Sequence, residues 1–261
     1  MKKSLGQNFL GDANILRKII DVAPKTLPVL EIGTGSGILT KGLAEAITLP
    51  IISYEIDRAT HEEATKQLAL FSHIQLIHAD FLSVDIPFLE PFVVIANIPY
   101  YITSPIVEKC LANPWVRGIY IMVQKEIANR MAAKPGEKDY SSFSVFCQTR
   151  SVVKKCFPVS RHCFFPPPRV DSAFIELIPT TRWTDQIHDI ETYDKIVHSA
   201  FWGKRKTIAS CLSRSPYLAL GSIKAKLILQ TSGIDPQLRG EMLSVADYIQ
   251  IANRLVELDT P

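Results

Sequence analysis

A short apolar run followed by a glycine-rich loop is the feature that most constrains how this chain can fold. Residues 29–32 predict a buried strand, residues 33–37 read Gly-Thr-Gly-Ser-Gly, and residues 38–47 predict a helix. The glycines let the backbone approach a ligand, and the free N–H groups at the helix start favour polar or anionic groups. This order indicates a nucleotide-binding unit, although a purely structural turn is the alternative. The third glycine of a dinucleotide fingerprint would fall at Ile38, which weakens the case for NAD.

The alternation of strands and helices continues as far as about residue 180. Apolar, β-branched runs predict further strands at residues 51–55, 74–78, 92–96, 118–124, 152–157 and 170–178. Helical spacing predicts helices at residues 12–23, 58–71, 104–111, 125–132 and 142–149. Beyond residue 183, short amphipathic helices replace the strand patterns. We therefore expect an α/β domain over residues 1–180, which begins with an extended arm, and a small helical domain over residues 181–261.

The composition is that of a soluble globular protein. A chain of 261 residues, 47% of them hydrophobic, can build the core of one large domain and an appendage. We find no leader-like apolar segment at the N-terminus and no run of 18 apolar residues, so we expect a cytoplasmic protein without a membrane span. The five cysteines are odd in number and lack Cys-x-x-Cys spacing, so we expect reduced thiols and no metal site.

The net charge of +3 is unevenly distributed along the chain. Residues 26–100 carry three Lys/Arg against nine acids, whereas residues 101–180 carry eleven against six. Basic surfaces beside a site favour a polyanionic partner, although an ordinary mixed surface also fits this excess. The triplet Lys204, Arg205 and Lys206 could neutralise phosphates, or could be a solvated helix face.

Acidic residues stand at the ends of the next two predicted strands. Glu55 lies about twenty residues beyond the first glycine, where a carboxylate can bind both hydroxyls of a ribose. Asp57 is two residues further on, and spacing alone does not separate the two acids. Asp80 could accept a hydrogen bond from an adenine amine, with Phe81 as a ring wall, or could cap a turn.

The tetrapeptide Asn97-Ile98-Pro99-Tyr100 follows the strand at residues 92–96 and suits a flat, amine-bearing group. Asn97 and the carbonyl of Ile98 can accept hydrogen bonds from an NH2 group, Pro99 stiffens the turn, and Tyr100 offers a ring for stacking. An ordinary strand-to-helix turn is the alternative. Phe164 and Phe165, before three prolines, could form a rigid platform on the other side of a base, or a packed loop.

These motifs, in this order, resemble those of the ribosomal RNA adenine dimethyltransferases of the KsgA/RsmA family. The resemblance runs nearly end to end. The arm motif Gln-Asn-Phe-Leu and the motif Phe-x-Pro-Pro-Pro-x-Val-Asp-Ser are highly specific, whereas the glycine loop would fit any methyltransferase that uses S-adenosylmethionine. The matching segments are residues 3–10, the loop at 31–37, Glu55, Asp80, residues 97–100, residues 164–173 and residues 204–207.

The resemblance implies a Rossmann-like, seven-stranded class I methyltransferase sheet with a helical, RNA-contacting C-terminal domain. It implies that the tetrapeptide orients the target amine, that Tyr100 and Phe164 hold the flipped adenine, and that Glu55 rather than Asp57 binds the ribose. The implied RNA-binding residues are Lys204, Arg205 and Lys206. The implied S-adenosylmethionine-binding residues are Asn8, Leu10, Gly33, Gly35, Glu55, Asp80 and Asn97.

The implied activity is dimethylation of N6 of two adjacent adenines near the 3′ end of 16S rRNA, in the small subunit or its precursor, by a monomeric enzyme. Two alternatives remain: an RNA-binding assembly factor with a vestigial methyltransferase fold, and a methyltransferase acting on another planar amine. The chain departs from the family pattern at Thr34, often Pro, and at Ile98, usually Leu. Ser141 and Ser142 follow Tyr140 where many relatives have Gly-Arg, so any RNA contact of that Arg is absent.

Overall fold

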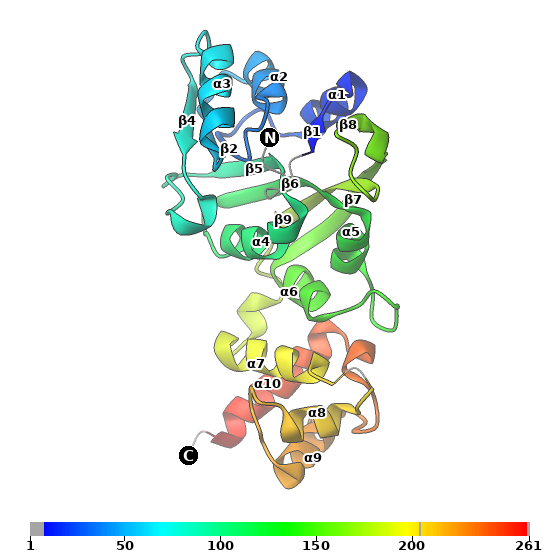
Figure 1. Cartoon of the computed structure of the whole chain (residues 1–261). Coiled ribbons are helices and arrows are strands. Elements are labelled where there is room, and N and C mark those ends of the chain that lie inside the picture. The colour runs from blue at the N-terminus through cyan, green and yellow to red at the C-terminus, as the bar shows by residue number, and fades with distance from the viewer. Residues whose placement is uncertain (1–7, 204, 260–261) are drawn as a thin grey trace. The chain divides into compact units, whose positions relative to one another are not determined.

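The computed structural model describes residues 8–203 and 205–259, and the chain divides into two compact units (Figure 1). The first unit contains the chain up to Ala128 together with Lys154–Pro179, and the second contains Asn129–Val153 and the chain from Thr180. The division falls within α5 (Lys125–Ala132) and β7 (Ser151–Val159).

The division between the two units does not coincide with the expected domain boundary at residue 180. Residues 129–153 come before that boundary but belong to the second unit. Tyr140 and Val145 from this segment are buried in the core of that unit together with Tyr193 and Tyr248. The hydroxyl of Tyr140 also donates to the carbonyl of Leu243 over 2.9 Å. A segment that reads locally as part of the α/β alternation therefore contributes its apolar residues to the helical unit.

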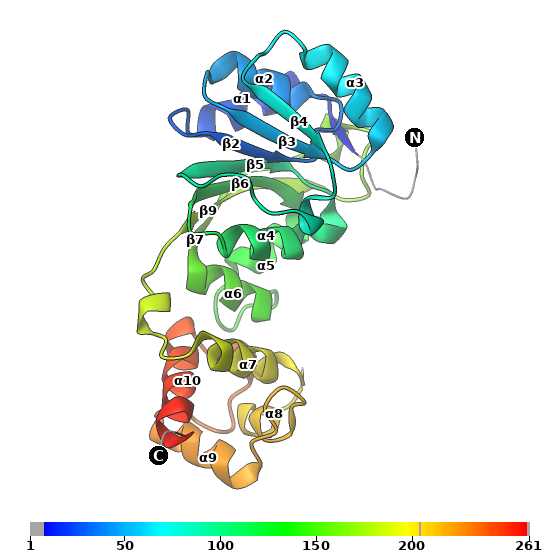
Figure 2. The ribbon, with the colours of Figure 1, turned by 90° about the vertical axis from the view of Figure 1, so that its left-hand side faces the viewer.

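A seven-stranded sheet is the frame of the first unit, in the order β4-β3-β2-β5-β6-β9-β7 (Figure 2). Strands β2 to β6 pair in parallel, and β9 pairs antiparallel with β6. The chain order reverses between β2 and β5, and open α/β sheets bind ligands at the carboxyl ends of the strands at such a point. Besides β7, the strands of this sheet are β2 (Val29–Ile32), β3 (Ile51–Glu55), β4 (Ile74–His78), β5 (Phe92–Asn97), β6 (Val116–Gln124) and β9 (Ser172–Pro179).

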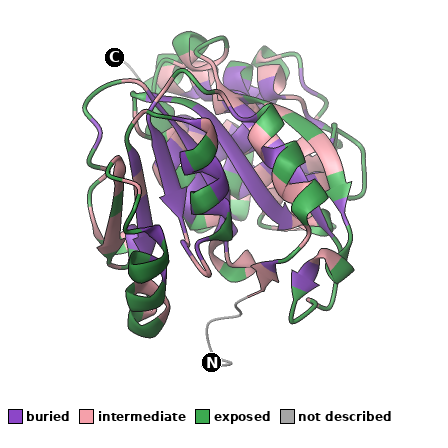
Figure 3. Ribbon diagram, turned by 90° about the horizontal axis from the view of Figure 1, so that it is seen from above, coloured by how far each residue is buried: buried purple, intermediate pink, exposed green. Residues whose placement is uncertain are grey.

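Helices cover both faces of this sheet, and this explains the continuous apolar runs of its central strands. Residues 92–96 of β5 are buried throughout, as in a parallel strand packed on both sides (Figure 3). Helix α1 begins after Asp12, whose side chain accepts hydrogen bonds from the N–H groups of Asn14 and Ile15. Helices α1 (Ala13–Val22), α2 (Ile38–Ala46) and α3 (Arg58–Leu68) lie on one face, and α4 (Thr103–Leu111) and α5 lie on the other (Figure 2).

The expected α/β fold class is confirmed, and the described chain also contains short elements that the sequence patterns did not predict. The arm contributes β1 (Phe9–Leu10), which pairs antiparallel with β8 (Phe164–Phe165) in a separate two-stranded ribbon. A 3₁₀ turn, η3 (Tyr100–Ile102), connects the tetrapeptide to α4. The rest of the arm motif, residues 3–7, lies outside the described residues.

The second unit is helical from Thr180 onward, as expected. In α6, the N–H of Ser141, the N-cap residue, donates to the Ser144 hydroxyl over 2.9 Å, so a capped helix start stands where many relatives have Gly-Arg. Among the described residues, no helix is long and apolar enough to cross a membrane. The helices of this unit are α6 (Ser142–Arg150), α7 (Ile190–Phe201), α8 (Ile208–Arg214), α9 (Ser222–Thr231) and α10 (Val245–Asp259).

Candidate active site

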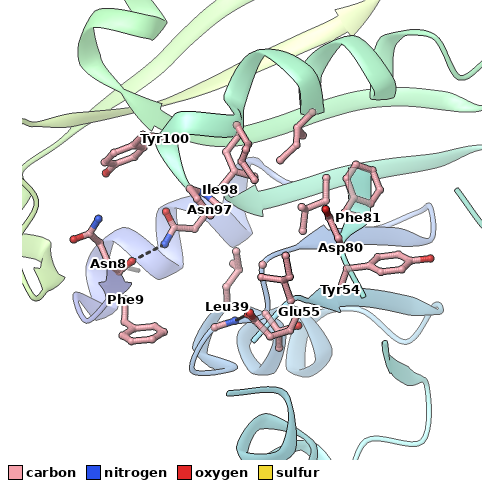
Figure 4. A pocket seen from close by; sticks show the side chains of 18 of the residues that line it. Asn8, Phe9, Leu39, Tyr54, Glu55, Asp80, Phe81, Asn97, Ile98 and Tyr100 are labelled. Carbon is pink, nitrogen blue, oxygen red and sulfur yellow. Dashed lines mark hydrogen bonds between the residues drawn. The ribbon is translucent and has the colours of Figure 1, made fainter. Parts of the chain in front are cut away.

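A cavity of about 220 Å³ lies at the carboxyl ends of β2, β3, β4 and β5 (Figure 4). Its walls are formed by the glycine loop that follows β2, by the ends of β3, β4 and β5, and by the N-terminal arm. The structure thus brings together motifs that are up to about ninety residues apart in the sequence. The expected site residues that line the cavity are Asn8, Leu10, Gly33, Gly35, Glu55, Asp80, Asn97, Ile98, Pro99 and Tyr100.

The glycine loop passes close to the arm at Gly35 and has a backbone conformation that favours glycine. Gly33 has φ +84° and Gly35 has φ +56°, both in the left-handed region that favours glycine. A Cβ atom on Gly35 would lie 3.3 Å from the ring of Phe9, and one on Gly33 would lie 3.6 Å from the carbonyl of Asn97. The loop therefore favours glycine at these two positions, and Thr34 and Ser36 line the cavity beside them.

Glu55 is held rigidly in the cavity wall by two backbone N–H groups. Its Oε2 accepts from Gly35 and its Oε1 accepts from Asp57, each over 2.8 Å, and the residue is only 4% exposed. Asp57 instead caps α3, because its carboxylate accepts from the N–H of Thr60 over 3.0 Å. The structure therefore separates the two acids that spacing alone left open, and only Glu55 lines the cavity.

Asp80 caps a turn and also lies at the cavity. Its Oδ1 accepts from the N–H of Leu82 over 2.9 Å and caps the 3₁₀ turn η2 (Phe81–Ser83), while the residue also lines the cavity. The ring of Phe81 is buried and packs 5.6 Å from the ring of Tyr54, which lines the same wall. A carboxylate beside aromatic and apolar side chains can select a flat ring that carries an amine.

The amide of Asn97, the last residue of β5, has a defined orientation. Its Nδ2 donates to the backbone carbonyl of Asn8 over 3.2 Å (Figure 4). Because a carbonyl can only accept, this contact assigns the other side-chain atom, Oδ1, as a free acceptor. Ile98, next in the chain, is only 2% exposed as a whole residue, and it also lines the cavity.

The hydroxyl of Tyr100 forms a hydrogen bond with a residue of β9, two strands away from β5 in the sheet. It lies 2.6 Å from Oγ of Ser172, the first residue of β9. Burial raises the pKa of the Tyr100 hydroxyl above its ordinary value, so the group stays neutral. Ser172 was not among the site residues expected from the sequence, although it ends the highly specific motif that begins at Phe164, and that motif was the available signal.

Phe164 does not reach the cavity, which differs from the expectation that its ring holds a base. In the ribbon, Leu10 pairs with Phe164 and Phe9 pairs with Phe165. Successive strand residues point to opposite faces, so Leu10 and Phe164 share the face that packs into the core, and Phe164 is 4% exposed. Phe165 is 74% exposed. The platform expected from two adjacent rings is therefore one buried ring and one exposed ring.

A second buried carboxyl, Glu31, lies behind the glycine loop and was not singled out from the sequence. It is fully buried in β2, and its Oε2 accepts from the hydroxyls of Thr40 and Ser53 over 2.6 and 2.7 Å. The Thr34 hydroxyl lies 2.6 Å from that of Ser53, so the residue that replaces the family's usual proline joins this network. Burial raises the pKa of Glu31 to about 7.

The basic triplet lies in the second unit, and only part of it is described. Lys204 lies outside the described residues. Arg205 is exposed, and the ammonium group of Lys206, also exposed, lies 4.0 Å from the centre of the Trp202 ring. All five cysteines are free thiols. Within residues 8–203 and 205–259, no three His, Cys, Asp or Glu side chains are grouped so that they could hold a metal ion.

The strand order and the position of the cavity define the chain as a class I methyltransferase, the class that uses S-adenosylmethionine. Its sequence matches the family described as "Ribosomal RNA adenine dimethylase" over residues 1–257. The chain belongs to this family. The identification made from its motifs is therefore confirmed, and the chain is an rRNA adenine dimethyltransferase.

Two curated relatives match nearly the whole chain. Ribosomal RNA small subunit methyltransferase A from Geobacillus thermodenitrificans (strain NG80-2) is 38% identical, covering 98% of this chain and 92% of that protein. The protein of the same name from Bacillus mycoides (strain KBAB4) is also 38% identical, covering 98% of this chain and 91% of that protein.

Two solved structures share the fold over nearly the same span. A dimethyladenosine transferase from Plasmodium falciparum has a TM-score of 0.79 and 27% identity, covering 96% of this chain and 97% of its own. The 23S rRNA methyltransferase ErmE has a TM-score of 0.73 and 28% identity, covering 95% of this chain and 100% of its own. Both similarities extend across the α/β and the helical parts of the chain.

Proposed function

We propose that this enzyme dimethylates N6 of two adjacent adenines near the 3′ end of 16S rRNA, in the small subunit or its precursor in the cytoplasm, using S-adenosylmethionine. The observation that carries the proposal is the position of Asn97 and Tyr100 beside a cavity lined by Glu55 and Asp80. The choice of the small subunit is supported by the relatives named for it, which are 38% identical, whereas ErmE, named for 23S rRNA, is 28% identical.

The residues of the cavity fit the parts of S-adenosylmethionine. Glu55 would bind the ribose hydroxyls, and Asp80 would accept from the adenine amine. The backbone of Gly33 and Gly35, which both line the cavity at positive φ, would receive the methionine end. Asn8, Leu10 and Asn97 complete the lining. When bound, the cofactor supplies an electrophilic methyl group on a sulfonium.

Asn97 and Ile98 would orient the nitrogen of the target adenine. An exocyclic amine is a poor nucleophile because its lone pair is delocalised into the ring. Oδ1 of Asn97, left free by the contact of Nδ2 with Asn8, and the carbonyl of Ile98 can each accept one N–H of the amine. Two such hydrogen bonds favour a tetrahedral nitrogen and localise the lone pair in the direction away from them.

The chain needs no strong base for this reaction, because the proton becomes acidic once the nitrogen is alkylated. The Tyr100 hydroxyl is unsuited to that role, since burial raises its pKa and it is bonded to Ser172. Its ring is suited to stacking instead. Flipping a base out of a helix costs a few kcal/mol, and stacking on aromatic rings returns roughly 1–3 kcal/mol per base.

Two residues of β8 are candidates for the second stacking ring. Position in the family motif assigns this role to Phe164, whereas exposure assigns it to Phe165. For RNA outside the cavity we propose contacts from Lys204, Arg205 and Lys206, because cations that neutralise phosphates supply much of the affinity for RNA. The proposed enzyme acts as a monomer.

The test is base-resolved mapping of N6,N6-dimethyladenine on small ribosomal subunits from a strain that lacks the modification. The subunits are incubated with the protein and S-adenosylmethionine, and a reaction without the cofactor is the control. We expect two adjacent modified adenines near the 3′ end of 16S rRNA. Unmodified subunits, with cofactor binding intact by calorimetry, would contradict the proposal and favour an assembly factor or another planar amine as substrate.

A further inference from the structure

Lys109, in the last turn of α4, binds the backbone of the turn that carries Asp80. Its Nζ donates to the carbonyls of Phe81 over 2.7 Å and Leu82 over 3.3 Å, and also to the carbonyl of Val84. A lysine ammonium has three N–H donors and no acceptor, so these three carbonyls use its full capacity. The side chain is only partly exposed. A cation held in this way is a fixed part of the structure rather than a solvated surface charge.

The same ammonium supports the aromatic wall of the cavity from behind. It lies 4.9 Å from the centre of the Phe81 ring, within the range of a cation–π interaction. The Phe81 ring, 4% exposed, packs in turn 5.6 Å from the ring of Tyr54, which lines the cavity. Loss of the cation would therefore loosen a ring that backs the cofactor side.

The η2 turn is fixed at both of its ends. At its start, the carboxylate of Asp80 accepts from the N–H of Leu82 over 2.9 Å. At its end, the carbonyls that a short turn leaves unpaired would need water, and Lys109 replaces that water. The direction of the Asp80 carboxylate thus depends on a residue that does not line the cavity.

Helix α4 connects this turn to the tetrapeptide. At the start of the helix, the hydroxyl of Thr103 donates to the carbonyl of Tyr100 over 3.1 Å. At its end, Lys109 holds the η2 turn. Nine helical residues span about 13 Å, so one rigid element is bonded to both the amine side and the adenine side of the site.

We propose that Lys109 is a positioning residue that fixes the Asp80 turn for the adenine of the cofactor and, through α4, keeps that turn in register with Asn97–Tyr100. The inference rests on the proposed function for the identity of the cofactor. The sequence shows only an ordinary lysine near a helix end, so the role follows from the three-dimensional contacts alone.

The test is the affinity of the Lys109→Met variant for two ligands, measured by calorimetry on the full chain. Methionine keeps the length of the side chain but has no charge and no donor. S-adenosylhomocysteine contains the adenosine and the amino acid, and 5′-methylthioadenosine contains the adenosine alone. We expect both affinities to fall about tenfold or more, as for loss of a charged hydrogen bond, and to fall by the same factor. The control is Lys66→Met, which also removes one positive charge, at an exposed position of α3, and should leave both affinities unchanged.

A purely structural role for Lys109 would give a different result. In that case the variant melts at a lower temperature but binds both ligands like the wild type, and this would overturn the inference. A loss confined to S-adenosylhomocysteine would overturn it as well, because the effect would then lie at the amino-acid end. If the methionine variant does not fold, Lys109→Gln, which keeps two donors, serves in the same titrations, and wild-type affinity would again overturn the inference. Wild-type protein that binds neither ligand would instead contradict the proposed function.

Discussion

The cofactor side and the base side of the cavity are built in different ways. On the cofactor side, Gly35 and Glu55 lie at the ends of adjacent parallel strands and bond to each other across 20 residues of chain. On the base side, Asn97 reaches the arm across 89 residues, and Tyr100 reaches Ser172 across 72 residues. Sheet register brings Gly35 and Glu55 together, whereas Asn97 and Tyr100 on the second side depend on single contacts between distant segments.

This difference indicates on which side of the cavity the enzyme should tolerate substitutions and on which side it should not. A parallel strand pair is fixed by many backbone bonds, so one altered side chain on the cofactor side changes affinity more than architecture. The base side has few fixed points, so each of them should influence the reaction strongly. Four predictions test this contrast, in decreasing order of expected effect.

The largest effect is expected for Asn97→Ala. The variant removes the acceptor that orients the amine, and loss of one such preorganised group typically lowers the rate by about 10²–10³. Asn97 is only partly buried at a strand end, so the melting temperature should change little. The measurement is the single-turnover rate of methylation of unmodified small subunits, together with a thermal melt. A rate near that of the wild type would rule out the orienting role.

The matched pair Phe164→Ala and Phe165→Ala separates a core ring from a contact ring. Removing the buried ring of Phe164 should lower the free energy of unfolding by roughly 3–5 kcal/mol. Removing the exposed ring of Phe165 should leave stability unchanged but raise KM for small subunits by roughly 5- to 150-fold, equivalent to one stacked base. Thermal melts and steady-state kinetics measure the two effects. Folded Phe164→Ala without activity, beside fully active Phe165→Ala, would restore the assignment made from motif position.

On the cofactor side, Glu55→Gln should weaken binding of S-adenosylhomocysteine by roughly 10- to 100-fold, because a hydrogen bond to a charged group is lost and an amide faces a backbone N–H. Calorimetry measures this affinity. The control is Asp57→Asn, which keeps an oxygen that can cap α3 and should bind like the wild type. Equal losses in both variants would mean that the ribose acid has been assigned incorrectly.

The smallest effect concerns stability and pH at Glu31, behind the glycine loop. Burial raises the pKa of this carboxyl in the folded state to about 7 from its ordinary value of 4.5. The folded state therefore binds the proton more tightly, and this stabilisation is present below pH 4.5 and lost as pH rises through about 7. Between about pH 5.5 and 7.5 the loss is roughly 1–2 kcal/mol. Urea melts of Glu31→Gln should show a free energy of unfolding without this pH dependence. If that free energy changes with pH as much as in the wild type, Glu31 is not the group responsible.

The sequence predicted which residues on the cofactor side meet at the cavity, because its signals there are local. A strand that ends in glycines or in an acid carries its own turn chemistry, so Gly33, Gly35, Glu55 and Asp80 could be assigned in order. Spacing alone did not separate Glu55 from Asp57, since both are carboxylates near a strand end, and the family resemblance was needed to favour Glu55. The geometry makes this choice, because only one of them faces the cavity and the other caps a helix.

The base side and the unit boundary were harder to predict, because long-range contacts determine both. Phe164 and Phe165 are adjacent and chemically alike, and only their pairing with β1 decides which ring is buried. Residues 129–153 have the local pattern of the first unit, yet Tyr140 and Val145 are buried in the second. In each case the deciding partner lies far along the chain, where periodicity gives no signal.

The pairing of β1 with β8 has a consequence for the folding of the protein during its synthesis on a ribosome. Phe9 leaves the exit tunnel early, but its partner Phe165 is added 156 residues later. At roughly 5–20 residues per second, the arm waits about 8–30 seconds for the strand that holds it. Throughout this interval the cavity lacks one wall, so a nascent chain acquires its methyl-transfer site only after Phe165 has been added.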